Sequence, residues 1–264
     1  MRDLPRGGRV YERHRKTTRL VSVSFGGAVM ILIIAGIFYA LRRWEILAVK
    51  TFTVFGNRLV EREEILSATQ AELALTPLGK LLGRENILLW KTIPKQEKTF
   101  SHPRIAAVTV DTNLFLRHVT LAVRERELFG IWCISGECYG FDRAGIAFLS
   151  APRPEGFLIF QVDDENTRPV SLGGSLFPGE VTRDVFFRVL DLLQREGVQP
   201  VGARILPYSL REWEVTLREG TKLALSTHFI PQGLGRILKT VMQSEEKEKV
   251  HTIDFRVPNR VYYR

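Results

Sequence analysis

The longest apolar run of the chain lies near its N-terminus. Residues 20–41 contain no charged side chain. A helix of this length is about 33 Å long, and the hydrocarbon core of a bilayer is about 30 Å thick. A cleaved signal peptide usually has a shorter apolar region and a small-x-small cleavage site, which the ending Phe38-Tyr39-Ala40-Leu41 does not provide. The pattern therefore predicts one uncleaved transmembrane helix at residues 20–41, since a core helix is rarely apolar on every face.

A first folded segment follows, in which alternating and helical patterns succeed one another. Its predicted elements are a strand at 51–55, a helix at 61–70, a loop at 76–83, an apolar segment at 86–90, a second helix at 91–100 and two strands at 105–111 and 119–125. Gly56-Asn57 turns the chain after the first strand, and Pro94 weakens the second helix. The predicted order is strand, helix, helix, strand, strand (βααββ).

The remainder of the chain, residues 127–264, is typical of short strands with two amphipathic helices. Strands are predicted at 128–134, 138–142, 146–149, 157–162, 203–207, 212–218 and 221–226. A helix predicted at 180–196 places on its core side Val181, Val185, Phe186, Val189, Leu192 and Leu193. A second helix begins near Gln232 and buries Leu234, Ile237, Leu238, Val241 and Met242, and its charged end at 245–249 is expected to be a solvated surface. We therefore predict an α+β fold, with an antiparallel sheet and two helices in this second part.

Composition and charge agree with a folded chain that is anchored in a membrane. Of the 264 residues, 45% are hydrophobic and 25% are charged, as in ordinary globular proteins. The formal net charge is +9, but residues 1–19 alone hold seven Lys or Arg against two acidic residues, and only four basic residues follow in 42–58. This asymmetry predicts that the N-terminus lies in the cytoplasm and that the bulk of the chain is exported. The basic tail is interpreted as a topology signal that contacts anionic lipid, so no nucleic-acid partner is predicted.

No arrangement of residues typical of catalysis or metal binding is evident in the sequence. The histidines are scattered and lack metal-ligand spacing: His14, His102, His118, His228 and His251. Ser175 lies in a glycine-containing turn that lacks the second glycine of a nucleophile elbow, and Asp163-Asp164 is predicted to be a solvated acidic turn. We therefore predict no catalytic residue, no metal, no cofactor and no small-molecule substrate, and the chain is not expected to be an enzyme.

The two cysteines flank a short turn. Cys133 and Cys138 bracket Ile134-Ser135-Gly136-Glu137. If Ser135-Gly136 is a two-residue turn, the cysteines stand directly opposite each other, with α-carbons about 4.5 Å apart. That separation suits a disulfide, and an exported compartment permits oxidation. We predict a local disulfide staple, and two reduced, half-buried thiols are the alternative.

Several short motifs resemble a known family. The motifs at 52–57, 64–65, 86–88, 102–105, 108–110 and 119–126 look like a POTRA module. Those at 139–148, 213–223 and 250–256 are similar to the strand-turn-strand, the tryptophan-bearing hairpin and the final Ile-Asp-hydrophobic-Arg strand of the FtsQ/DivIB family of bacterial cell-division proteins. The resemblance implies a POTRA domain at 48–126 and an FtsQ-type β domain at 127–264. Residues 112–117 lack the proline that the family usually has between its last two POTRA strands.

The resemblance implies a non-enzymatic, single-pass inner-membrane scaffold of the division septum. Such a protein would bind the coiled-coil proteins FtsB and FtsL and help control septal peptidoglycan synthesis. In the family a partner pairs with the terminal strand, which implies partner-binding roles for Phe255, Arg256, Val257, Tyr262 and Tyr263. Pro258 cannot donate a ladder hydrogen bond, which suits an edge or a bend. Here Val257-Pro258-Asn259 stands where the family more often has an aromatic residue and a glycine turn.

Two alternatives stay open. POTRA modules also precede outer-membrane barrels, where they act in envelope transport or as assembly chaperones, but that architecture needs a cleaved signal and many amphipathic β-segments. The terminal strand can also complete its sheet without binding any partner.

Overall fold

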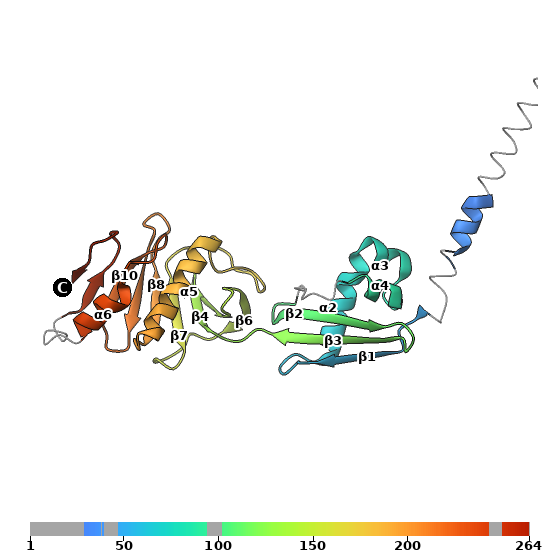
Figure 1. Cartoon of the computed structure of the whole chain (residues 1–264), viewed down its shortest axis with the longest axis horizontal. Coiled ribbons are helices and arrows are strands. Elements are labelled where there is room, and N and C mark those ends of the chain that lie inside the picture. The colour runs from blue at the N-terminus through green and yellow to red at the C-terminus, as the bar shows by residue number, and fades with distance from the viewer. Residues whose placement is uncertain (1–28, 38, 40–46, 94–101, 243–249, 264) are drawn as a thin grey trace, which may run out of the picture. The chain divides into compact units, whose positions relative to one another are not determined.

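The computed structural model describes residues 29–37, 39, 47–93, 102–242 and 250–263. These residues divide into two compact units. The first contains the described residues up to Phe55 with 66–93 and 109–122, and the second contains 56–65, 102–108 and 123–263. The fold is α+β, as the sequence predicts, and is built on one sheet of three strands and one of nine (Figure 1).

The predicted transmembrane helix lies largely outside the described residues. Of the span at 20–41, only 29–37 and 39 are described, and residues 29–37 are helical. Within the described part of the chain, no helix is both long and apolar enough to cross a membrane. The basic tail at 1–19 and the charged segment at 245–249 also lie outside the described residues.

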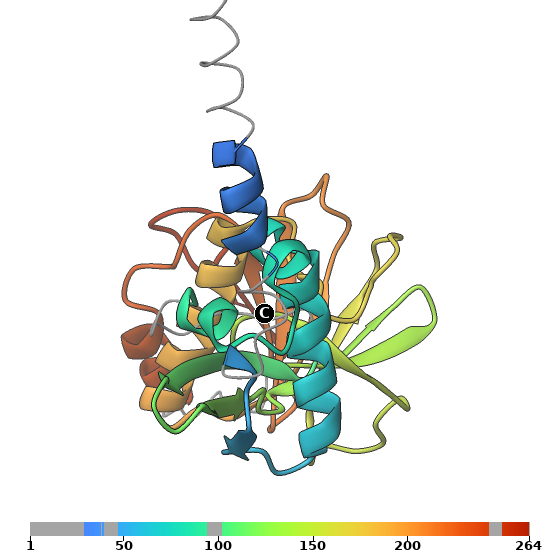
Figure 2. The same ribbon diagram turned by 90° about the vertical axis from the view of Figure 1, so that its right-hand side faces the viewer.

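The three-stranded sheet has the order β1-β3-β2. Its strands are β1 (Thr51–Phe55), β2 (Ile105–Asn113) and β3 (His118–Glu125), and β1 runs parallel to β3. Three helices connect β1 to β2: α2 (Arg62–Leu75), α3 (Pro77–Leu82) and α4 (Ile87–Lys91). Figure 2 looks along the strands and shows these helices on one side of the sheet. The ring of Phe52 on β1 meets the buried Trp90 of α4 edge to face at 5.2 Å between centroids.

The structure has two helices in this segment that the sequence did not predict. The loop predicted at 76–83 is mostly α3, because Pro77 occupies the first helical turn, where its missing N–H costs nothing, and the Thr76 hydroxyl accepts a hydrogen bond from Gly79 N. The apolar segment at 86–90 forms α4, which Asn86 caps. Helix α4 ends at Lys91, where the second helix was predicted to begin, and residues 94–100 of that predicted helix lie outside the described residues. Helix α2 also continues five residues beyond its predicted end at residue 70.

The nine-stranded sheet has the order β12-β11-β10-β9-β8-β7-β4-β5-β6. Its strands are β4 (Gly130–Ile134), β5 (Glu137–Phe141), β6 (Ala147–Ala151), β7 (Phe160–Asp164), β8 (Pro200–Ile205), β9 (Glu212–Leu217), β10 (Lys222–Ser226), β11 (Thr252–Asp254) and β12 (Tyr262–Tyr263). The prediction of an antiparallel sheet is wrong: the sheet is mixed, since β4–β7, β7–β8 and β10–β11 are parallel pairs. Two of these pairs are joined through helices, and a helical crossover brings the next strand back in the same direction.

Those crossover helices are α5 (Glu180–Arg195) and α6 (Leu234–Met242), seen beside the sheet in Figure 1. Both pack into one core with Trp132, Phe186 and Trp213 near its centre. Helix α5 begins at its predicted residue and ends one residue early, and it buries most of the predicted core positions. Leu192 is partly buried against the core, whereas Val181 is exposed because it lies in the first turn of α5, before core contact begins at Val185.

Candidate functional site

The C-terminal edge of the nine-stranded sheet holds the residues that the sequence singles out. Strand β11 runs parallel to β10, with Ile253 opposite Leu223. Strand β12 then pairs antiparallel with β11, with Tyr262 opposite Asp254 and Tyr263 opposite Ile253. Among the described residues no strand lies beyond β12, so its outer edge is available for pairing.

The turn between β11 and β12 is held by backbone bonds at both ends. Phe255 N donates to Ala224 O at 2.8 Å, and Arg260 N donates to Val257 O at 3.3 Å. Asn259 adopts a left-handed conformation with φ of 61°, which asparagine tolerates better than most residues. Pro258 lies in this turn and outside either strand, so its missing N–H interrupts no ladder.

Arg256 connects this turn to β11 and to β9, the strand beyond β10. Its Nε donates to Asp254 Oδ1 at 2.9 Å, and its Nη1 donates to Glu212 Oε2 at 2.8 Å. The Arg256 N–H also donates to Asp254 Oδ1 at 2.9 Å. The hydrogen bond to Asp254, and to a smaller extent the one to Glu212, raises the pKa of Arg256 above its ordinary value. The guanidinium is therefore engaged within the chain, and Arg256 positions the edge.

The two tyrosines of β12 point to opposite faces of the sheet, because successive side chains alternate. Tyr262 shares its face with Asp254 and lines a hollow of about 320 Å³ together with Glu212 and Glu214. Tyr263 borders this hollow and also lines a second one of about 370 Å³, beside α6, with Ile237, Val241 and Val261. The first hollow is lined by acidic residues and by Arg256, which pairs with two of them, and the second is largely apolar.

The five predicted partner-binding residues differ in exposure. Tyr262 and Tyr263 are 52% and 64% exposed, and Val257 is exposed as well. Phe255 is 1% exposed and belongs to the core. It therefore packs beneath this edge of the sheet and offers no surface for a partner to contact. The sequence did not predict that other residues also line this edge, because only the order of the strands brings them there. These residues are Glu212, Glu214 and the α6 residues of the second hollow.

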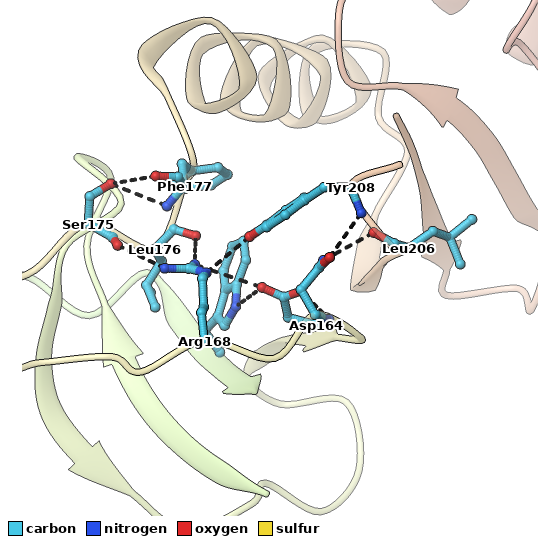
Figure 3. A network of polar contacts seen from close by, with 9 residues as sticks. Asp164, Arg168, Ser175, Leu176, Phe177, Leu206 and Tyr208 are labelled. Atoms are coloured by element: carbon cyan, nitrogen blue, oxygen red, sulfur yellow. Dashed lines mark hydrogen bonds and ion pairs between the residues drawn. The ribbon is translucent and has the colours of Figure 1, made fainter. Parts of the chain in front are cut away.

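A buried polar network lies elsewhere in the same unit, around Asp164 (Figure 3). Asp164 Oδ2 accepts from Trp132 Nε1 at 3.1 Å, and Oδ1 accepts from Asn166 N at 3.0 Å and Asn166 Nδ2 at 2.7 Å. The solvated acidic turn predicted for Asp163-Asp164 is therefore wrong: both residues belong to β7, and Asp164 is buried. A buried carboxylate needs such donors to replace its hydration.

The network extends to Arg168 and Tyr208 (Figure 3). Arg168 Nε donates to the Tyr208 hydroxyl at 3.1 Å, and its Nη2 donates to Leu176 O. Burial, followed by the negative charge of Asp164, raises the pKa of Tyr208. The positive charge of Arg168 partly offsets this rise. Because these groups bind one another, they join β7, residues 165–176 and the segment after β8 into one structure, and we assign them a structural role.

The predicted pairing of Cys133 with Cys138 is present in the structure. The two sulfurs are bonded at 2.04 Å, and the α-carbons lie 4.0 Å apart. Ser135 and Gly136 form the turn with φ of 53° and 86°, and Ile134 pairs with Glu137 as expected. No group of three His, Cys, Asp or Glu side chains that could hold a metal ion occurs within the described ranges.

Comparison with known proteins adds no further identification: no protein-family model matches the chain, and no curated protein matches it.

Proposed function

We propose that this chain is a bitopic inner-membrane protein of the FtsQ/DivIB type, with an anchor at 20–41, a POTRA domain at 48–126 and an FtsQ-type β domain at 127–264. Its N-terminus lies in the cytoplasm and its bulk on the periplasmic side, at the division septum. It acts as a non-enzymatic scaffold that binds small coiled-coil membrane proteins similar to FtsB and FtsL and helps control septal peptidoglycan synthesis.

The proposal is supported by the motif order in the sequence and by a fold compatible with it. A three-stranded sheet with helices between its first two strands suits a POTRA module. The single observation that carries the binding role is the outer edge of β12, which ends the sheet and has a hollow on each face.

This edge suits binding by strand addition. A partner segment pairs with β12 through main-chain hydrogen bonds, and its side chains alternate between the two faces. On the face of Tyr262 they meet Glu214, which favours polar or basic partner residues. Glu212 is already paired with Arg256. On the face of Tyr263 they meet Ile237 and Val241, which favours apolar ones. A partner strand that alternates between these two classes therefore fits best.

Deletion of residues 257–264 tests the proposal. It removes β12 and the turn before it but leaves the core residues Ile253 and Phe255 in place, so the protein should fold, insert into the membrane and lose the partner. Tyr262→Ala and Tyr263→Ala should each weaken binding about 30-fold, which corresponds to the roughly 2 kcal/mol of a hot-spot residue. Phe157→Ala is the matched control, since Phe157 is an exposed aromatic residue of the same sheet domain in the loop before β7.

Affinity is measured with purified full-length protein and its coiled-coil partner in detergent. Unchanged affinity of the folded deletion variant would show that this edge is not the binding site. The mass of the mature protein tests the anchor separately, because a chain cleaved within or after residues 20–41 would favour the envelope-transport alternative.

A further inference from the structure

The turn between β2 and β3 exposes three consecutive large apolar side chains. Leu114, Phe115 and Leu116 are 40%, 100% and 68% exposed, and we call these three residues the apolar tip. Scattered single apolar residues are normal on a protein surface, but a cluster on a protruding turn is typical of a surface that contacts an apolar partner. Because the Phe115 side chain is fully exposed, it is free to insert into an apolar phase.

The backbone of the apolar tip is held in place by Asn113. The Asn113 side-chain oxygen accepts hydrogen bonds from Phe115 N and Leu116 N, both at 3.1 Å. The turn closes at Arg117, which has a left-handed φ of 53°. Because two backbone donors already have a partner, their transfer out of water costs less free energy than the transfer of unpaired N–H groups. The side chains of the tip are thus presented outward on a backbone suited to a partly apolar environment.

The apolar tip lies at the end of the sheet where the chain begins β1. Lys50 N donates to Arg117 O at 2.8 Å, and the Thr51 hydroxyl lies 2.7 Å from His118 Nδ1. Thr51 and His118 are also register partners in the parallel β1–β3 pair, so the turn and the start of β1 lie together (Figure 1). This end of the sheet is therefore the one nearest, along the chain, to the expected anchor.

The distance along the chain is short. Eight residues, 42–49, separate Leu41, the last residue of the expected span, from Lys50. Even fully extended, they reach about 30 Å at most. Lys50 and Arg117 flank the apolar tip with positive charge. Basic residues beside exposed Phe and Leu are typical of segments that lie in the interface of a membrane, where anionic headgroups attract the cations.

We propose that the apolar tip inserts into the interface of the same bilayer that holds the anchor. The three-stranded sheet then has a second membrane contact besides its covalent link, and this contact limits its rotation about the anchor. The inference rests on the proposed function only in requiring that residues 20–41 span the membrane. It requires neither the partner nor the septum.

The test places a fluorescent label at the apolar tip of the full-length chain in lipid vesicles that contain no other protein. Phe115→Cys provides one labelling site, and Leu116→Cys repeats the measurement at its neighbour. The two native cysteines form a disulfide, so an unreduced preparation carries the label only at the introduced thiol. An environment-sensitive dye reports the polarity around it, and quenchers attached to lipid or dissolved in water report which phase it contacts.

Phe55→Cys is the matched control. Phe55 is an exposed phenylalanine at the other end of β1, 52% exposed. It lies about 13 Å farther along the strand than Thr51, at 3.3 Å per residue. The dye at 115 and 116 should shift to the blue and be quenched by lipid-borne quencher, and it should be protected from the aqueous one. The dye at 55 should show the opposite behaviour, which excludes attraction of the dye itself to lipid.

If the dye at 115 and 116 is quenched to the same extent as the dye at 55, the inference is overturned. It is also overturned if the dye at 115 and 116 is protected from the aqueous quencher but is not quenched by the lipid-borne one. Resistance of the chain to alkaline extraction is measured on the same vesicles. A chain that is extracted overturns the anchor and, with it, this inference. An anchored chain whose apolar tip remains in water overturns the inference alone and leaves the proposed function intact.

Discussion

Removal of the charge of Glu125, at the end of β3, is expected to destabilise the turn that follows β1. The carboxylate accepts hydrogen bonds from Arg58 N at 2.7 Å, Leu59 N at 3.0 Å and Val60 N at 3.0 Å. Hydrogen bonds to a charged acceptor contribute about 1.5–3 kcal/mol each, roughly twice a neutral one. Glu125→Gln keeps one carbonyl acceptor and removes the charge. Because the carboxylate is partly exposed, we expect a loss of about 1–2 kcal/mol of local stability.

The contribution of Glu125 depends on pH. Burial raises the pKa of Glu125, but the N–H groups of Arg58, Val60 and Leu59 outweigh burial, so the pKa lies below its ordinary value of 4.5. A carboxyl group whose pKa is lower in the folded state stabilises the fold above its unfolded pKa, and this contribution is lost as the pH falls through the folded pKa. The difference between the wild type and Glu125→Gln should therefore be largest near neutral pH and shrink in acid.

Hydrogen exchange of full-length protein in lipid nanodiscs measures this effect directly. At pH 7 the amides of residues 58–60 should exchange about 5- to 30-fold faster in Glu125→Gln, which corresponds to the expected free-energy loss. Glu127→Gln is the control, because Glu127 is exposed and lies two residues away. Equal exchange in wild type and Glu125→Gln at neutral pH, or a difference that persists unchanged in acid, would refute the reasoning.

Two further predictions concern the disulfide and one glycine. Replacement of Cys133 and Cys138 by serine should lower the free energy of unfolding, measured in urea, by about 2 kcal/mol, the value for a small closed ring. If both thiols of the wild-type protein can be alkylated without reductant, the disulfide is absent. Gly56→Ala should destabilise more than Gly220→Ala in the same assay: both have φ near 90°, but a Cβ at Gly56 would lie 2.2 Å from Val123 O, whereas Gly220 faces open space. Equal losses would show that the close approach at Gly56 is relieved without cost.

Local patterns in the sequence predict local structure well in this chain. The core residues of α5 follow the helical period, and the turn at Ser135-Gly136 is enough to place Cys133 opposite Cys138. The helices α3 and α4 were also readable in principle. Thr76 before Pro77 is a helix start, but a proline and glycine in close succession favoured a loop.

Non-local features were not predictable from one sequence. The parallel pairing of β7 with β8 depends on where α5 returns the chain, and no pattern within either strand encodes it. The burial of Asp164 depends on Trp132, which is distant in the sequence and approaches Asp164 only in the folded sheet. At the candidate edge, the motif led to β11 and β12, but it did not reveal that Phe255 is buried or that Arg256 binds Glu212.

Site-specific photo-crosslinking in intact cells tests the central claim most directly. A photoreactive phenylalanine analogue replaces Tyr262 or Tyr263 on β12, or Phe157 as the exposed aromatic control. The account predicts that both edge positions form an adduct with a small coiled-coil membrane protein, identified by mass spectrometry, and that position 157 does not. An adduct with that protein at 157 and none at 262 or 263, in folded and membrane-inserted protein, would contradict the claim that a partner strand pairs with β12.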